Sequence, residues 1–155
     1  MRSSRLGLTA AILLALALGT ATPASAAPND GAITTLRATS YNACLDGNQA
    51  GRTYVSDCDR NNSYHRWQWI ARGDGFQLRS QGTGRCLADD GSRIVTRTCN
   101  TGDLRQIWLA NDAEFDEGYV QLLNNATSRY LAYASDIGLT GVTQHESYGW
   151  FPEAI

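Results

Sequence analysis

The side chains that could carry acid–base or metal chemistry in this chain are few and widely spaced. His65 and His145 are the only histidines, and neither stands in the spacing of a Ser-His-Asp triad or a zinc site. The acidic stretch at residues 112–117 is best interpreted as a solvated loop, with an adventitious cation site or a glycosidase carboxylate pair as alternatives. We therefore expect no catalysis, no metal and no cofactor, a structural role for His65, and an exposed His145.

Three segments of the chain repeat the same order of residues. Trp recurs at positions 67, 108 and 150, which gives a period of 41 to 42 residues. A period of this length indicates repeated units, none of which can bury its apolar face alone. The expected repeats span about residues 33–73, 75–114 and 118–155. In each repeat a Leu precedes a Cys or Tyr by eight positions, as in Leu36 and Cys44, Leu78 and Cys86, and Leu122 and Tyr130.

The tryptophans are of two kinds. Trp67, Trp108 and Trp150 recur at the repeat period, and a large side chain at equivalent positions of each unit indicates core packing. Trp69 stands outside the pattern and is therefore a candidate for an exposed position.

The cysteines occupy matching positions in the first two repeats. Cys44 and Cys58 lie in the first repeat, and Cys86 and Cys99 lie at the equivalent places in the second. Four cysteines allow three pairings, and the repeat selects the pairing within single repeats, where each bond would join neighbouring strands. A zinc site is the rival interpretation, but the CxxC pairs of structural zinc are missing, so we predict two disulfides.

The first 26 residues are organised like a secretory signal peptide. Two arginines precede an apolar run from Leu6 to Leu18, and residues 24–26 (Ala-Ser-Ala) supply small side chains at the cleavage position. The run is too short for a membrane anchor, and nothing later in the sequence resembles a span. We expect residues 1–26 to be removed and residues 27–155 to be secreted as a single domain.

The charge composition argues against polyanionic partners. The chain has 13 Arg and no Lys against 15 Asp and Glu, a formal net charge of −2. No basic cluster stands out along the sequence. A mildly acidic chain of this kind is not expected to take nucleic acid or an anionic membrane as its main partner.

The rest of the chain has the texture of an all-β protein. Short runs of β-branched, aromatic and aliphatic residues, such as residues 33–36 and 66–70, are separated by turn signals at intervals of about 8 to 12 residues. No segment after the first 26 residues holds an apolar stripe with the helical period. We predict about four short strands per repeat.

The pattern Cys44-Leu45-Asp46, Cys58 and Trp67, with its counterparts in the second repeat, resembles the ricin B-type lectin family. The resemblance covers essentially residues 33–155. It implies a β-trefoil of three repeats, in which a six-stranded barrel is capped by three hairpins around a pseudo-threefold axis. The core of that fold would be filled by Leu36, Leu45, Trp67, Leu78, Leu87, Trp108, Leu122, Leu131 and Trp150.

The resemblance also implies a sugar site at Asp46. In ricin-type lectins the Asp two positions after the first Cys accepts hydrogen bonds from two sugar hydroxyls, and an ionised carboxylate forms stronger bonds than a neutral acceptor. The later repeats have Ala88 and Ala132 at this place, with Asp89 one position late and facing the opposite side of a continuing strand. At most the first repeat would keep a site. The alternative interpretation is that Asp46 only begins an Asp-Gly turn.

Other residues of the first repeat would complete this site in an altered form. The aromatic platform of the family falls at Ser56, and Tyr54, on the same face of the strand, is its substitute. The Asn-Gln pair of the family is replaced by Tyr64-His65, and an amide would come from Asn62. The expected sugar-binding residues are Asp46, Tyr54, Asn62, Tyr64 and His65.

The sequence therefore predicts a secreted, monomeric protein that binds carbohydrate of the galactose or xylose type without catalysis. A single site would bind weakly and would not cross-link cells. The main alternative is a protein-interaction β-trefoil, such as a protease inhibitor or effector, whose sugar site has decayed. A glycoside hydrolase would need a second carboxylate facing Asp46, and the sequence offers no natural candidate.

Overall fold

A computed structural model describes residues 27–39, 42–112, 118–134, 139–143 and 149–155. The expected signal peptide, most of the acidic stretch at 112–117, and His145 lie outside the described residues. In the described part of the chain all regular structure is β-strand except for two single-turn 3₁₀ helices. No helix of these residues is long and apolar enough to cross a membrane.

Twelve strands follow one another in the described part of the chain. They are β1 (Ile33–Ala38), β2 (Ala43–Gly47), β3 (Thr53–Asp57), β4 (Arg66–Arg72), β5 (Gly75–Ser80), β6 (Cys86–Asp89), β7 (Ile94–Arg97), β8 (Trp108–Asp112), β9 (Val120–Asn124), β10 (Tyr130–Ala134), β11 (Leu139–Thr143) and β12 (Trp150–Ala154). The 3₁₀ helices η1 (Ser63–His65) and η2 (Leu104–Gln106) directly precede β4 and β8.

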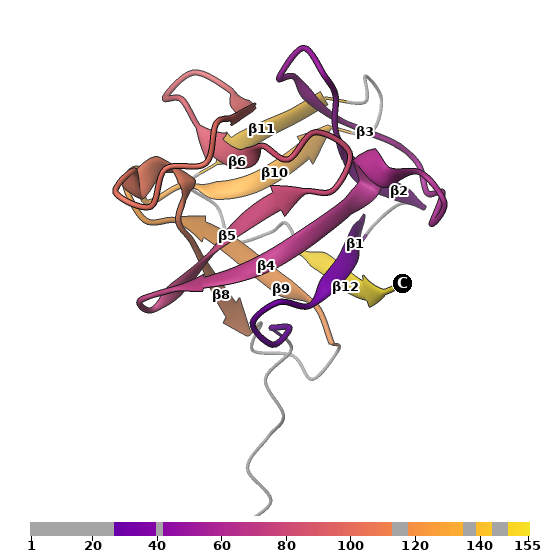
Figure 1. Ribbon diagram of the computed structural model, residues 1–155, viewed down its shortest axis with the longest axis horizontal. Helices are drawn as coiled ribbons and strands as arrows, with labels where there is room; N and C mark the ends of the chain where they lie inside the picture. Colours follow the sequence, from indigo (N-terminus) through magenta and orange to yellow (C-terminus); the bar gives the residue numbers. More distant parts are fainter. Residues whose placement is uncertain (1–26, 40–41, 113–117, 135–138, 144–148) are drawn as a thin grey trace, which may run out of the picture.

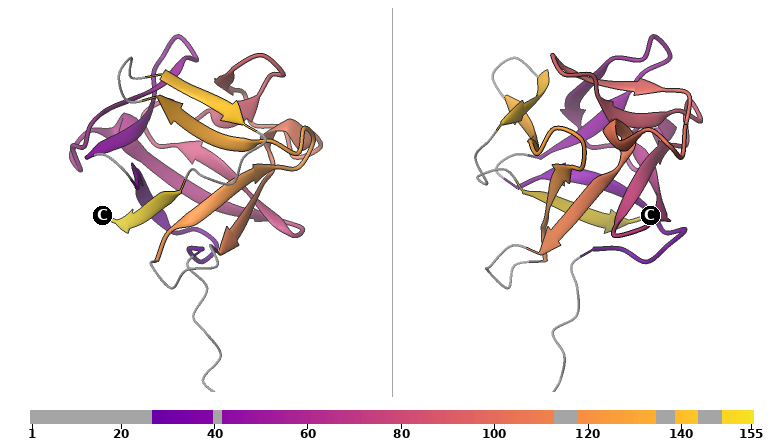
Figure 2. Two further views of the ribbon diagram at one scale, coloured as in Figure 1. Left: turned by 180° about the vertical axis from the view of Figure 1, so that it is seen from behind. Right: turned by 90° about the vertical axis from the view of Figure 1, so that its left-hand side faces the viewer.

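Six of these strands close into a barrel. β1 pairs with β4, β4 with β5, β5 with β8, β8 with β9, β9 with β12, and β12 returns to β1, always antiparallel. Closure leaves the barrel without a free sheet edge. The other six strands form the hairpins β2–β3, β6–β7 and β10–β11, which lie to one side of the barrel strands (Figures 1 and 2).

This architecture corrects the fold predicted from sequence. The chain is all-β, but it forms a closed six-stranded barrel with additional strands rather than a trefoil arrangement, and all twelve strands join one hydrogen-bonded sheet. The equivalent pairing within each repeat is unequal: three residue pairs join β1 to β4, but one joins β5 to β8 and one joins β9 to β12. Repeat spacing predicts equivalent positions in each unit, whereas strand pairing depends on the backbone register, which the spacing does not record.

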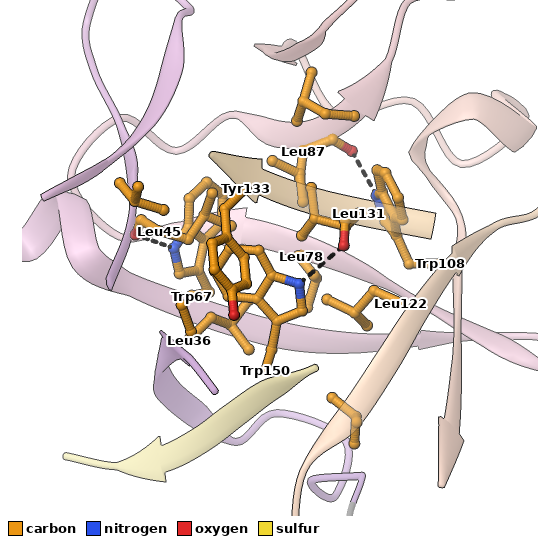
Figure 3. Packing of buried hydrophobic residues seen from close by; sticks show 14 of the residues in the cluster. Leu36, Leu45, Trp67, Leu78, Leu87, Trp108, Leu122, Leu131, Tyr133 and Trp150 are labelled. Atoms are coloured by element: carbon orange, nitrogen blue, oxygen red, sulfur yellow. Dashed lines mark hydrogen bonds between the residues drawn. The ribbon is translucent and has the colours of Figure 1, made fainter. Parts of the chain in front are cut away.

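The repeated tryptophans share one contact that recurs in the core. Each is fully buried and donates its indole N–H to the carbonyl oxygen of a leucine one position after the repeated Cys or Tyr (Figure 3). The bonds are Trp67 to Leu45 at 3.0 Å, Trp108 to Leu87 at 3.1 Å and Trp150 to Leu131 at 3.2 Å. These bonds satisfy the one polar group of each indole where water has no access.

Trp69 is also buried, contrary to the sequence-based expectation. It is 0% exposed, donates its indole N–H to the Thr34 hydroxyl at 2.9 Å, and meets the ring of Phe76 edge-on at 5.2 Å. Trp69 lies two residues after Trp67 in β4, and side chains two apart face the same side of a strand. The strand period therefore places both indoles in the barrel.

Two disulfides fasten the first two hairpins. Cys44 in β2 bonds Cys58 just after β3, and Cys86 in β6 bonds Cys99 two residues after β7. The bonds close loops with sequence separations of 14 and 13 residues. Loops of this size contribute about 3 kcal/mol each in the chain-entropy model.

Replacing Trp108 by Phe should test the recurring indole bond. The variant leaves the Leu87 carbonyl buried without its donor and opens a small cavity, so the free energy of unfolding should fall by about 2 kcal/mol in urea denaturation. Leu104→Ala is the control, because Leu104 is 54% exposed and its loss should change stability by no more than about 0.5 kcal/mol. Equal stability of the two variants would contradict the assignment.

Candidate functional site

The hairpin β2–β3 places Asp46 directly opposite Tyr54. Asp46 lies within β2, so the interpretation as an Asp-Gly turn residue is wrong; the chain turns after Gly47. Gly47 is needed for packing, because a Cβ there would lie 2.8 Å from Cη2 of Trp67. Asp46 thus lies between two residues that contact the buried indole, Leu45 and Gly47, and its side chain has an exposed fraction of only 5%.

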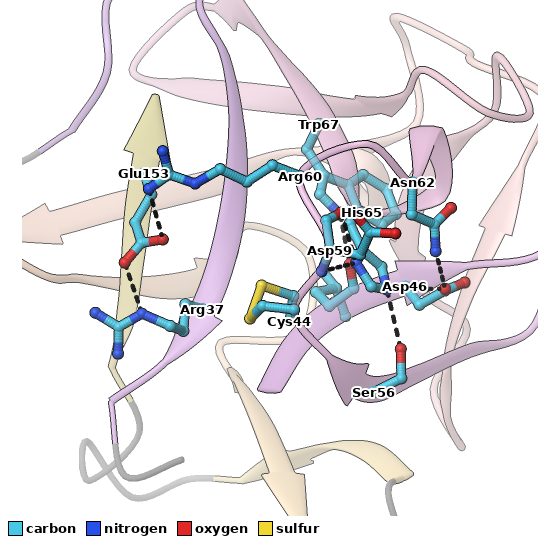
Figure 4. Close-up of a disulfide and its surroundings, with 12 residues drawn as sticks. Arg37, Cys44, Asp46, Ser56, Asp59, Arg60, Asn62, His65, Trp67 and Glu153 are labelled. Carbon is cyan, nitrogen blue, oxygen red and sulfur yellow. Dashed lines mark hydrogen bonds and ion pairs between the residues drawn. A yellow bond between two sulfur atoms is a disulfide. The ribbon is translucent and has the colours of Figure 1, made fainter. Parts of the chain in front are cut away.

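The Asp46 carboxylate is only partly satisfied. Its Oδ2 atom lies 3.2 Å from Nε2 of His65 and accepts a long hydrogen bond of 3.5 Å from Nδ2 of Asn62 (Figure 4). Its Oδ1 atom is buried and has no hydrogen-bond partner among the described residues. A buried carboxylate oxygen that accepts no hydrogen bond lowers the stability of the folded protein. We therefore expect a water molecule or a ligand to donate a hydrogen bond to this atom.

The 3₁₀ turn η1 brings Asn62 and His65 to Asp46. Asn62 precedes η1 and accepts the Tyr64 N–H at 3.0 Å through Oδ1, which leaves its amide nitrogen directed at the carboxylate. The imidazole of His65 is 1% exposed and accepts the backbone N–H of Asp59 at 3.1 Å through Nδ1. The other ring nitrogen, Nε2, faces both the Asp46 carboxylate, at 3.2 Å, and the Ser56 hydroxyl, at 2.9 Å.

Tyr54 supplies a protonated phenol next to this carboxylate. Burial raises the pKa of Tyr54 above its ordinary value of 10.0, and the negative charge of Asp46 and a side-chain hydrogen bond to Asp46 raise it further, against smaller opposing effects of Arg52 and Asn48. The phenol is consequently a neutral hydrogen-bond donor at any physiological pH. Because its ring is only partly buried, part of its surface remains open to solvent.

Tyr64 does not contact Asp46. Its hydroxyl accepts a hydrogen bond from Nε2 of Gln49 at 3.2 Å, and its ring covers Gly82, where a Cβ would lie 2.5 Å from Cδ1. Of the five residues predicted to bind sugar, the structure therefore gathers Asp46, Tyr54, Asn62 and His65, and it places Tyr64 on the neighbouring surface. Ser56 and Asp59, which orient His65, were not assigned a role from sequence because neither matches the family motif.

The second repeat uses its carboxylate differently. Asp89 is 0% exposed and its oxygens accept bonds from the Arg129 guanidinium at 2.6 and 3.1 Å, from the Thr127 hydroxyl and from the Gly91 N–H. Burial alone would raise the pKa of Asp89, but these bonds outweigh it and lower the pKa below 3.8. Asp89 is thus an ion-pair partner that fastens β6 to the turn before β10, and it is not available to a ligand.

Metal chemistry finds no support in the part of the chain that the structure describes. No group of three His, Cys, Asp or Glu side chains is placed to hold a metal ion within those residues.

No family model matches the chain, and no curated protein matches its sequence. Solved structures do match its fold. SeviL bound to the asialo-GM1 saccharide has a TM-score of 0.67 and 14% identity over 78% of this chain and 95% of that chain. The Haemophilus ducreyi cytolethal distending toxin has a TM-score of 0.63 and 16% identity, over 79% of this chain and 83% of that chain.

An enzyme also contains a similar fold. The GlcNAcα1-4Gal-releasing endo-β-galactosidase of Clostridium perfringens matches with a TM-score of 0.70 and 14% identity over 80% of this chain. The chain spans only 33% of that enzyme's length. Identities at this level show a common fold, and this fold occurs in proteins that bind or act on carbohydrate.

Asp89→Ala should destabilise the protein strongly. The change leaves the Arg129 guanidinium without its buried partner, so the free energy of unfolding should fall by about 3 kcal/mol at neutral pH, measured by urea denaturation. Asp74→Asn, in the exposed β4–β5 turn, is the control and should have a negligible effect.

The same ion pair makes stability depend on pH. Because the pKa of Asp89 is lower in the folded chain than in the unfolded chain, its contribution is complete above about 3.8 and is lost as the pH falls through the folded value. Acid unfolding curves of wild type and Asp89→Ala should therefore converge below that pH. A constant difference down to acid pH would contradict the role of the ionised carboxylate.

Proposed function

We propose that this protein binds carbohydrate, without chemical catalysis, at a single site formed by Asp46, Tyr54, Asn62 and His65. The observation that carries the proposal is the Oδ1 atom of Asp46, which is buried and has no donor in the described structure. Sugar hydroxyls are donors of the right size for such an atom, and bonds to an ionised carboxylate are among the stronger hydrogen bonds.

The neighbouring groups suit a sugar. The phenol of Tyr54 is a protonated donor across the strand pair from Asp46, and its partly open ring offers an apolar face. The hydrogen bond from the Asn62 amide to Oδ2 is long, at 3.5 Å, and therefore weak. A sugar hydroxyl can displace this amide at little cost in free energy. The groups next to the Asp46 carboxylate are an amide, an imidazole and the Tyr54 phenol, whereas a hydrolase would need a second carboxylate there.

The expected ligand is of the galactose or xylose type, and the expected protein is a secreted monomer. The two disulfides are compatible with an extracellular location. A monomer with one site should bind weakly, because avidity requires several sites on one particle.

A glycan and polysaccharide binding screen on residues 27–155 tests the proposal. Asp46→Asn keeps the shape of the side chain but removes its charge, so binding should weaken about tenfold or more. Asp74→Asn removes an equal charge from an exposed turn and should bind like wild type. If Asp46→Asn binds the glycan as tightly as wild type, the sugar site does not depend on Asp46 and must lie elsewhere on the protein.

One observation favours a second function. The Asp46 side chain is only 5% exposed and already contacts Asn62 and His65, as expected for a sugar site that has closed. In that case the protein would act by contacting another protein, as an inhibitor or effector. A folded, disulfide-bonded sample that binds nothing in the glycan screen would make this second function the better one.

A further inference from the structure

A pocket of about 270 Å³ lies between the β2–β3 turn and the β6–β7 hairpin. It does not include any of the residues assigned to the sugar site. Its lining is made of Ala50, Gly51, Arg52, Arg85, Asp90, Arg93, Val95, Thr96 and Arg97. The volume lies just below the range of pockets for drug-sized ligands, so it suits a small ligand or one end of a larger one.

The charge of this lining is strongly positive. Four arginines face one carboxylate, that of Asp90, which leaves a formal charge of +3 within a chain whose formal net charge is −2. The pKa of Asp90 is lowered to about 2, mainly because its carboxylate accepts a backbone hydrogen bond from Ser92. Asp90 is therefore ionised at neutral pH, and its negative charge belongs in this sum. Asp90 neutralises the charge of the neighbouring arginines only weakly, because both ion pairs are long. Its Oδ2 lies 3.6 Å from Nε of Arg93 and 3.7 Å from Nη2 of Arg97.

Arg85 is held in this pocket with unused hydrogen-bonding capacity. Its Nη1 donates to the Gln49 carbonyl oxygen at 3.4 Å, a long bond, and its Nε is buried with no partner among the described residues. The guanidinium lies against Gly51, where a Cβ would be 3.1 Å from Nη2. Gly51 also has a φ of +80°, so both the conformation and the space at this position favour glycine.

Like charges gathered around a concave surface repel one another unless an anion joins them. Arginine is the side chain that binds planar or tetrahedral oxyanions best, because its fork of donors matches two oxygens at once. The acidic chain as a whole repels an extended polyanion, whereas a single oxyanion group needs only the local field of the pocket.

We propose that this arginine pocket, lined by Arg52, Arg85, Arg93 and Arg97, binds one oxyanion group of a small ligand: a carboxylate, a sulfate or a phosphate. The site is separate from Asp46 and does not require the proposed sugar site, although the Gln49 carbonyl links Arg85 to the turn that also contacts Tyr64.

Isothermal titration with four probes tests the pocket and identifies the source of the oxyanion. The probes are glucuronate, N-acetylglucosamine 6-sulfate, glucose 6-phosphate and inorganic sulfate, with neutral glucose as the blank. We expect saturable binding of at least one anionic probe, none of glucose, and weakening as salt is added. If inorganic sulfate binds as tightly as the sugar sulfate, the result would also support an anion site in the pocket. It would identify the oxyanion group alone as the part of the ligand that is recognised.

The double variant Arg93→Gln/Arg97→Gln removes two pocket charges without touching the core, because these side chains are 71% and 45% exposed. Affinity for the anionic probe should fall about tenfold or more. Arg60→Gln removes a charge outside the lining, on a side chain that is 64% exposed, and should bind like wild type. No saturable binding by wild type, or an equal loss in Arg60→Gln, would overturn the proposal.

Discussion

The contact on which the rest of the structure depends is the hydrogen bond from each buried indole to a leucine carbonyl in the hairpin beside it. Trp67, Trp108 and Trp150 begin or nearly begin barrel strands, and their acceptors lie in β2, β6 and β10. An indole that loses its acceptor in a dry core is costly, so each bond fixes where a hairpin sits over the barrel. The residue that follows the acceptor leucine is fixed by the same bond.

That following residue decides what each repeat can do. It is Asp46 after Leu45, but Ala88 after Leu87 and Ala132 after Leu131. Only the first repeat therefore carries a carboxylate at this position, and among the described residues its Oδ1 is the buried carboxylate oxygen that remains without a donor. The second repeat places its carboxylate one residue later, at Asp89, where Arg129 neutralises it. Similar backbones thus give a candidate binding site in one repeat and an ion pair in another.

Sequence reasoning succeeded where local chemistry decides the outcome. The all-β class follows from strand-length apolar runs between turn residues, and the two disulfides join cysteines at matching places in the repeats. Reasoning from the repeat failed for Trp69, because the repeat period was given more weight than the two-residue period of a strand. It also failed for the arrangement of strands, since pairing such as that of β3 with β11 joins residues 85 positions apart, Tyr54 and Leu139.

The candidate sites show the same limit. Asp46, Asn62 and His65 were named from a motif, and η1 brings them together because they are close in the chain. The partnership of Asp89 with Arg129 spans 40 positions, and the arginine pocket collects residues from 52 to 97. No basic cluster is visible along the sequence, yet the hairpins assemble one in space. Contacts of this range become predictable only when the strand order is known.

The most direct test of the central claim is a crystal structure of residues 27–155 soaked with a high concentration of galactose. The account predicts a sugar hydroxyl at about 2.7 Å from Oδ1 of Asp46, the ring against Tyr54, and the Asn62 amide displaced from Oδ2. A structure in which Oδ1 binds only a buried water molecule, with Asn62 unmoved and no sugar beside Tyr54, would contradict it.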